Sequence, residues 1–332
     1  MDPTNSSSRG PTPKTGNTTV YDRHFESHMA NHGIFLPDAR YSDGTKVGEP
    51  ENIADIQRQL QARRPSLALS EGSLRKEYTE FRELNNWTSD EQLVVQKILP
   101  ILNGPQQSSF HDGGNHPFTN LAPLTNGTLA NAKPDMYHGA PPCQLHPRVR
   151  EQLNDQIIPT RQTSRPITPN FFVEAKGHCG SPYVLERQAL YDSALGARAM
   201  YSLQQYGHTQ EGHRRRRRRR SSNRPQNDDN CSNPAPAPGP THDNRAYTIA
   251  STFQKGTLGI YATHPRRTPS HINPGADRRT DYVMTQIGHY SLIGSPESYQ
   301  QGLSAYRNSR DLAKEYRDEF IRQANERHEA GR

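Results

Sequence analysis

One run of residues constrains the fold more than any other, the segment from Asn170 to Gly177. It reads Asn-Phe-Phe-Val-Glu-Ala-Lys-Gly, with consecutive apolar positions ahead of its charged tip. Consecutive apolar residues over this length predict a strand that is buried on both faces, as in the centre of a sheet. Glu174 and Lys176 are two positions apart, so a strand points both side chains to the same face, which predicts a charged pair at the edge of a cleft.

Helical spacing of apolar residues appears on both sides of this strand. Ser89 and Gln92 have the spacing of a capping box, and Pro100 is expected to stop or kink the helix that follows them. Ser295 is expected to cap the last helix. The pattern predicts helices at 71–86, at 89–102, at 183–206 and from Pro296 onward.

Further strands are predicted after the long helix at 183–206. Alternating apolar residues at 246–253 and 257–263 predict a hairpin that turns at Lys255 and Gly256. Another strand is predicted at 282–287. Helices and strands therefore alternate along the chain, which predicts a mixed α/β fold.

Composition indicates that part of the chain does not belong to a packed core. Only 30% of the 332 residues are hydrophobic, and there are 27 Pro and 24 Gly, whereas globular domains contain about 45–50% apolar residues when Gly is included. We expect one domain at 71–325, interrupted by a disordered Arg- and Pro-rich insert at 207–243. Before the domain we expect a disordered tail at 1–20 and a weakly ordered polar segment at 21–70, and after it a C-terminal tail at 326–332.

The positive charge of the chain is concentrated in one tract. The formal net charge is +7, and Arg214 to Arg220 form a run of seven Arg, so the rest of the chain is neutral. Such a tract attracts phosphate backbones, and it is also the type of short basic sequence that is read as a nuclear import signal. The alternative is a low-complexity insertion without a function.

The sequence also bears on the compartment. No stretch approaches the ~18–20 consecutive apolar residues of a membrane span, so no membrane partner is expected. The first residues lack the pattern of a secretory signal, which predicts that the protein is not secreted. Cys143, Cys179 and Cys231 are scattered and have no CxxC spacing, which argues against a disulfide framework or a zinc site. We expect an intracellular protein, located in the nucleus rather than in the cytoplasm.

A second acidic residue, Asp135, completes the candidate chemistry. It follows Pro134, and together with Glu174 it offers two carboxylates. Paired carboxylates bind a hard divalent cation such as Mg²⁺, which needs oxygen ligands and keeps several waters. A bound cation lowers the pKa of its water and stabilises charge developing on a phosphate, while a nearby Lys176 positions or deprotonates the nucleophile.

These residues resemble a known superfamily of enzymes. Pro134-Asp135, the Glu174-x-Lys176 triplet on a strand and a following helix with Gln188 look like the PD-(D/E)XK nucleases. The sequence Gln188-Ala-Leu-Tyr191 is similar to the Gln-and-Tyr helix motif of the branch that includes recombination exonucleases.

The chain resembles an uncharacterised fungal family more closely, over roughly residues 71–325 without the insert. Members of this family share a domain of unknown function that is thought to be nuclease-like. The segments that carry this resemblance are Phe118–Leu121, Lys133–Asp135, Asn170–Gly177 and Arg187–Arg198.

The resemblance implies a fold and a set of roles. It implies a restriction-endonuclease-like αβββαβ core with additional helices, with Asp135 and Glu174 as ligands of Mg²⁺ or Mn²⁺. Lys176 is the implied catalytic lysine, and Gln188 supports the site or contacts the substrate. The predicted function is metal-dependent hydrolysis of phosphodiester bonds in nucleic acid.

Less specific interpretations remain open. The chain can keep this fold as a catalytically inactive module that acts in protein or nucleic-acid interaction. Asp135 can lie in a turn, Glu174 and Lys176 can form a solvated ion pair at a strand end, and Gln188 can simply pack on its helix. Glu91 can be a further metal ligand or, as we favour, part of a helix cap.

Overall fold

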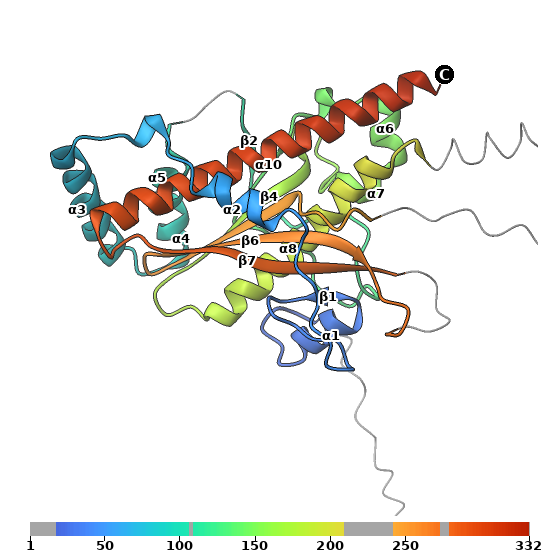
Figure 1. Ribbon diagram of the computed structural model, residues 1–332, viewed down its shortest axis with the longest axis horizontal. Coiled ribbons are helices and arrows are strands. Elements are labelled where there is room, and N and C mark those ends of the chain that lie inside the picture. Colours follow the sequence, from blue (N-terminus) through green and yellow to red (C-terminus); the bar gives the residue numbers. More distant parts are fainter. Residues whose placement is uncertain (1–17, 106–108, 209–241, 273–278, 332) are drawn as a thin grey trace, which may run out of the picture.

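A single mixed sheet organises the chain (Figure 1). The computed structural model describes residues 18–105, 109–208, 242–272 and 279–331, and within these ranges seven strands pair in the order β1-β7-β6-β5-β4-β3-β2. The pairs β1–β7 and β4–β5 are parallel and the others are antiparallel. The mixed α/β fold predicted from the sequence is therefore confirmed. The strands are β1 Ile34–Phe35, β2 His111–Gly113, β3 Met136–Ala140, β4 Ile167–Lys176, β5 Thr248–Gln254, β6 Thr257–Arg267 and β7 Thr280–Ser291.

Strand β4 lies inside the sheet and is buried along its whole length, as its apolar run predicts. Its side chains alternate between the two faces. Phe171, Val173 and Ala175 belong to the core beneath α10, whereas Phe172 packs with residues of α8. The alternation places Glu174 on the α8 face.

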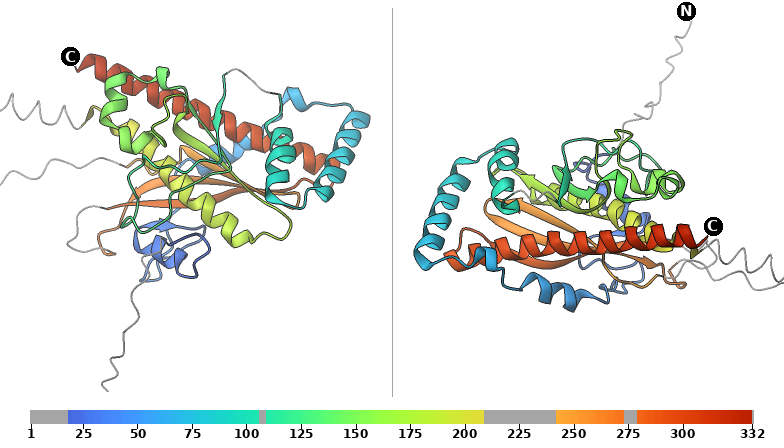
Figure 2. Two further views of the ribbon diagram at one scale, coloured as in Figure 1. Left: turned by 180° about the vertical axis from the view of Figure 1, so that it is seen from behind. Right: turned by 90° about the horizontal axis from the view of Figure 1, so that it is seen from above.

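Helices cover both faces of the sheet (Figures 1 and 2). Helix α8 (Pro182–Gln205) packs on one face together with α1, and α10 (Pro296–Ala330) crosses the other face together with α2 and α3. No helix of the described ranges is both long and apolar enough to cross a membrane. The remaining helices are α1 Phe25–Asn31, α2 Ile53–Leu60, η1 Pro65–Leu67, α3 Glu71–Trp87, α4 Glu91–Leu93, η2 Val94–Ile98, α5 Leu99–Asn103, η3 Pro142–Gln144, α6 Pro147–Gln152 and α7 Asn154–Ile157.

Two local turn predictions agree with the structure. Ser295 caps α10 with a capping box, in which its hydroxyl accepts a hydrogen bond from the Ser298 N–H. Lys255 and Gly256 connect β5 to β6, and their φ angles are 50° and 76°. Positive φ at both residues is what a two-residue hairpin turn of the right twist requires.

The helical segment after α3 differs from its prediction in its cap. The cap is Asp90, whose Oδ1 accepts the Leu93 N–H at 2.9 Å, and not Ser89. The Ser89 carbonyl instead accepts the His178 N–H at 2.9 Å. The segment runs to Asn103, close to the predicted end at 102, and it does not stop at Pro100, because the turn before it is a π-helix, whose wider spacing accommodates a residue without an N–H.

The segment at 21–70, expected to be weakly ordered, contributes α1, β1, α2 and η1. Phe25 and Met29 of α1 are buried against the α8 face, and Ile56 and Leu60 of α2 are buried on the α10 side. The residues that they pack against are far away in the sequence. The polar local sequence of 21–70 therefore predicts less ordered structure than this segment has.

The C-terminal tail is shorter than predicted, because helix α10 continues to Ala330, into the segment 326–332. The predictions of disorder at 1–20 and 207–243 concern mostly residues 1–17 and 209–241, which lie outside the described residues. At the described margins, Thr18 forms a bridge with Leu129, and Asp243 accepts a hydrogen bond from the Tyr247 hydroxyl at 2.7 Å.

Candidate functional site

A pocket of about 330 Å³ opens beside the carboxyl end of β4 and the first turns of α8. Its lining combines residues from the sheet, from α8 and from two loops that are distant in the sequence. The lining residues are Thr18–Tyr21, Phe25, Glu91, Asn115, Ala130–Lys133, Asp135, Lys176, Gln188, Tyr191 and Asp192.

The sheet brings Asp135 and Glu174 together. Strands β3 and β4 are antiparallel with Met136 opposite Val173, so Asp135, one residue before β3, lies opposite Glu174. The Asp135 N–H donates to Glu174 Oε1 at 3.1 Å, and the Ala175 N–H donates to Asp135 Oδ2 at 2.8 Å. These reciprocal bonds fix both carboxyl groups to the backbone of the opposite strand. The long connection between β3 and β4 is filled by η3, α6 and α7.

A third carboxyl group meets them from α8. Asp192 is 3% exposed, and its side chain interacts with that of Glu174, which is fully buried. Burial raises the pKa of Asp192 to about 7, and the charge of Asp135 contributes to the rise. The pKa of Glu174 is also raised well above its ordinary value by burial, with the charges of Asp192 and Asp135 adding to the effect.

The charge of Lys176 favours the ionised forms of the buried acid pair, but burial outweighs it and the pKa of both groups is raised. Glu174 Oε2 and Asp192 Oδ2 are buried and accept no hydrogen bond in the described structure. A proton on Glu174 allows its carboxyl group to donate to Asp192. A proton or a cation is therefore needed at this position, because two buried carboxylates with free lone pairs are costly.

Lys176 is held at the floor of the pocket by Glu91. Its Nζ lies 2.6 Å from Glu91 Oε2, and its side chain is 5% exposed. Burial alone would lower the pKa of Lys176, but the hydrogen bond and charge of Glu91, with Asp135 and Glu174 adding to them, raise it. Lys176 is therefore a charged donor. Glu91 does not cap its helix, a role that Asp90 fills.

Gln188 and Tyr191 lie on the pocket side of α8. Gln188 Oε1 is buried without a hydrogen-bond partner in the described structure, so this amide has an acceptor available for a ligand. The hydroxyl pKa of Tyr191 is raised by burial. Gln188 lies four residues before Asp192, about one helical turn away, and Tyr191 directly precedes Asp192.

The residues fit a cation held by two carboxylates. Glu174 Oε2 has no hydrogen-bond partner among the described residues, and the Asp135 carboxyl group is near enough to raise the pKa of Glu174, so the two offer the kind of oxygen donor that Mg²⁺ prefers. No group of three or more His, Cys, Asp or Glu side chains within the described ranges is arranged to hold a metal ion. An ion here would complete its coordination with water, which Mg²⁺ commonly does.

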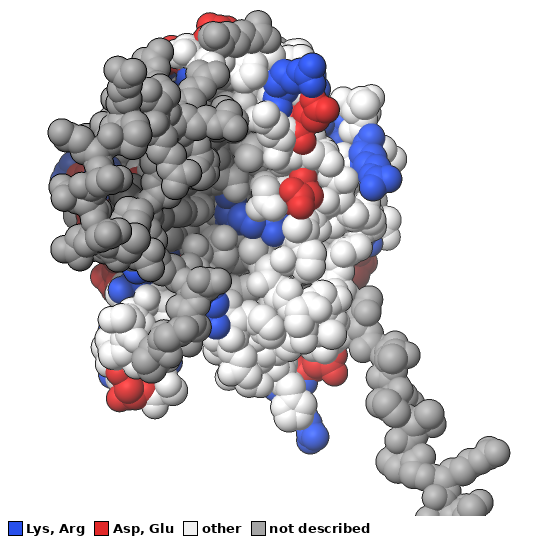
Figure 3. Space-filling view, turned by 90° about the vertical axis from the view of Figure 1, so that its right-hand side faces the viewer, with Lys and Arg blue, Asp and Glu red and all other residues white. Residues whose placement is uncertain are grey.

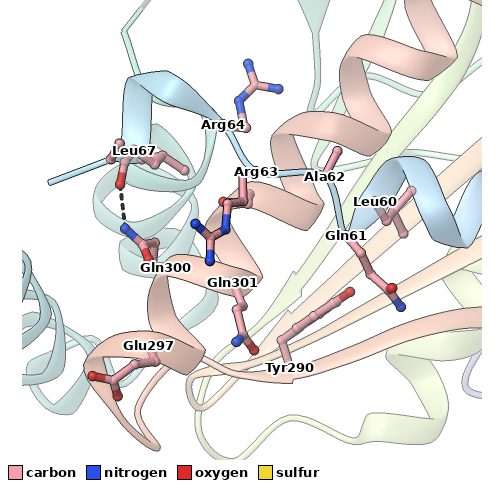
Figure 4. Close-up of a pocket in the computed structure, with 12 residues that line it drawn as sticks. Leu60, Gln61, Ala62, Arg63, Arg64, Leu67, Tyr290, Glu297, Gln300 and Gln301 are labelled. Carbon is pink, nitrogen blue, oxygen red and sulfur yellow. Dashed lines mark hydrogen bonds between the residues drawn. The ribbon is translucent and has the colours of Figure 1, made fainter.

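A larger pocket, of about 710 Å³, lies on the α10 side of the sheet (Figure 4). It is formed by the connection after α2, the end of β7 and the first turns of α10. Arg63, Tyr290, Glu297 and Gln301 line it, and Glu297 is its one carboxylate. Size alone favours this pocket, but a single carboxylate offers neither a pair of acid groups nor a metal site, so the smaller pocket is the better candidate.

The structure brings together all four residues singled out from the sequence, Asp135, Glu174, Lys176 and Gln188. Sequence reasoning missed Asp192, although its position four residues after Gln188 places both on one face of a helix. It also missed the contribution of residues 18–21 to the pocket, for which no local signal exists.

The comparisons with known proteins add no relative. No family model, no curated protein and no solved structure matches the chain.

Proposed function

We propose that the chain is a Mg²⁺- or Mn²⁺-dependent nuclease that hydrolyses phosphodiester bonds in nucleic acid. The observation that carries this proposal is that Asp135, Asp192 and Lys176 line one pocket, while the buried carboxyl group of Glu174 lies beneath it, bonded to the Asp135 backbone and interacting with Asp192. Carboxyl groups with raised pKa values next to a fixed cation are typical of catalytic sites rather than of ordinary surface ion pairs.

The order of elements supports the proposal. Helix α5 is followed by β2, β3 and β4, then by α8 and by β5, which pairs in parallel with β4. Apart from η3, α6 and α7, which lie between β3 and β4, this order is compatible with the αβββαβ core that the resemblance to PD-(D/E)XK nucleases implies, in which Glu174 and Lys176 would lie on the third strand. Strands β6, β7 and β1 extend the sheet beyond this proposed core.

Each side chain has a role in this mechanism. Asp135 and Glu174 would hold the metal ion, which when bound supplies an activated water and stabilises charge on the phosphate. Lys176 remains protonated, so it donates a hydrogen bond that orients the attacking water or a phosphate oxygen, and it does not act as a base. Asp192 positions Glu174, and Gln188 offers its free amide oxygen to the substrate or to a water.

The direct test is a cleavage assay on the purified full chain. Single- and double-stranded DNA and RNA are incubated with Mg²⁺, with Mn²⁺ or with EDTA. We expect hydrolysis of at least one of these nucleic acids with either metal and none in EDTA. Absence of cleavage in every combination would contradict the proposal.

A catalytically inactive module with this fold is the second candidate. The observation in its favour is that the described residues visible in Figure 3 form no extended basic patch, since Lys and Arg lie among Asp and Glu on that face. The ion pair between Lys176 and Glu91 also neutralises one of the two lysines that line the pocket, the other being Lys133. Nucleic-acid or protein binding without any hydrolysis is the result expected of such a module.

We also propose that the protein is located in the nucleus, through the tract from Arg214 to Arg220, which lies outside the described residues. Deletion of these seven residues is expected to shift a protein with a large fluorescent tag from the nucleus to the cytoplasm. Microscopy of both forms measures the shift, and circular dichroism of the purified proteins checks the fold. An unchanged distribution contradicts the proposal.

A further inference from the structure

The large apolar side chains that are most exposed in the described chain are aromatic. Trp87 is 81% exposed, Tyr21 is 71% exposed and Tyr183 is 70% exposed, while Ile293 follows at 37%. Tyr and Trp side chains are usually at least half buried, because they contribute a large apolar surface to the core. Three such side chains in solvent therefore indicate a binding surface.

These three residues lie around the candidate site. Tyr21 lines the pocket itself. Trp87 ends α3, two residues before Ser89, whose carbonyl accepts the N–H of His178 at 2.9 Å. Tyr183 lies in the first turn of α8.

The turn from Gly177 to Ser181 connects these features. It begins one residue after Lys176, packs against the segment after Trp87 and leads directly into Tyr183. Gly177 lies directly against that segment, because a Cβ added to it would meet the Ser89 carbonyl oxygen and the Asp90 backbone. The turn is held in place by the Gln254 side chain, which donates to the carbonyls of Gly177 and Gly180 at 3.1 and 2.7 Å. Trp87 and Tyr183 are thus presented on a fixed scaffold.

From this arrangement we infer that the substrate is single-stranded nucleic acid, whose unpaired bases stack on Trp87, Tyr183 and Tyr21 while the backbone enters the pocket. This inference rests on the proposed nuclease function. A base stacks on an aromatic side chain through its flat face, which is accessible in a single strand and covered within a duplex. The residues outside the Arg tract are neutral overall, so stacking supplies affinity that phosphate contacts do not.

The test uses a property of the sequence, namely that Trp87 is the single Trp of the chain. Its fluorescence therefore reports on this surface alone. The full chain is titrated in EDTA, which prevents cleavage, with single-stranded oligothymidylate and with the same strand annealed to its complement. We expect the single strand to quench the emission of Trp87 and the duplex to bind more weakly and quench less.

Variants separate stacking from charge. The Arg tract attracts either form of nucleic acid, and every variant retains it, so differences between variants report on stacking. Trp87→Ala and Tyr183→Ala are each expected to weaken binding of the labelled single strand by about 5- to 100-fold. Trp87→Phe, which keeps an aromatic face, is expected to retain most of the affinity. Ile293→Ala is the matched control, an exposed apolar side chain without an aromatic face, and is expected to have no effect.

Several results would overturn this inference. The first is that the duplex binds as tightly as the single strand. The second is that the single strand leaves the emission of Trp87 unchanged, as expected if this surface binds a protein instead. The third is that Trp87→Ala and Tyr183→Ala both bind the single strand as tightly as the wild type. Metal-dependent cleavage of duplex without a response of Trp87 overturns the inference and leaves the nuclease proposal in place. Binding of single strands that depends on Trp87, without cleavage of any substrate, supports the surface and contradicts the nuclease.

Discussion

Replacing Glu174 or Asp135 with Ala is expected to abolish Mg²⁺-dependent cleavage and to weaken metal binding, because each change removes one of the two proposed ligands. Lys176→Ala is expected to reduce cleavage by about 10²- to 10³-fold, the usual effect of removing one charged donor from a catalytic site. The same change leaves metal binding intact or strengthens it, since a cation beside the carboxylates competes with the ion. Calorimetric titration with Mg²⁺ and a cleavage assay measure both effects.

This pattern separates a metal site from a structural ion pair. If Glu174 and Lys176 only stabilise the fold, their replacement leaves metal binding unchanged. Glu83→Ala is the matched control, because Glu83 is an exposed carboxylate on α3 outside the pocket. It is expected to change neither metal binding nor cleavage, and its effect on stability should stay within the ~0–1 kcal/mol of an exposed charge.

The second large effect concerns stability of the metal-free protein against pH. A carboxyl group with a raised pKa favours the folded state while it is protonated. This contribution is complete below the pKa of the unfolded chain, about 4, and is lost as the pH rises through the folded pKa, about 7 for Asp192. Asp192→Asn cannot ionise and should therefore be more stable than the wild type at high pH. The gain is expected to reach about 1–3 kcal/mol above neutral pH and to be small at about pH 5.

Urea denaturation in EDTA at about pH 5 and about pH 8 measures this difference. Glu83→Gln provides the control, because loss of an exposed carboxylate should have the same small effect at both pH values. A gain for Asp192→Asn that does not grow with pH would contradict the raised pKa. Saturating Mg²⁺ should reduce the advantage of the variant, since an ion that binds only the folded state stabilises the wild type.

Strong local patterns made the central elements predictable from the sequence. The apolar run of β4 predicted a buried strand, and it placed Glu174 and Lys176 at the correct end of it. The capping sequence at Ser295 predicted the start of α10 to the residue. In each case the information lies within a few neighbouring residues, which is where periodicity and capping rules apply.

The missed features depend on contacts between distant segments. Glu91 was expected to cap a helix, but the buried ammonium of Lys176 attracts its carboxylate across 85 positions of sequence. The Asp192 carboxyl group gains its role only when α8 packs over Glu174. Residues 18–21 have no periodic pattern, and their place in the pocket follows from packing alone.

Strand β4 and helix α8 form the floor of the pocket and also belong to the core of the sheet. A change that moves Glu174 or Asp192 must therefore disturb the packing that keeps the protein folded. The walls at 18–21 and 130–133 lie outside the named helices and strands, and of these residues only Ala132 is a buried member of the core on the α8 face. Under the proposed nuclease function, a new substrate preference would accordingly arise by exchange of exposed wall residues, while the acid groups stay in place.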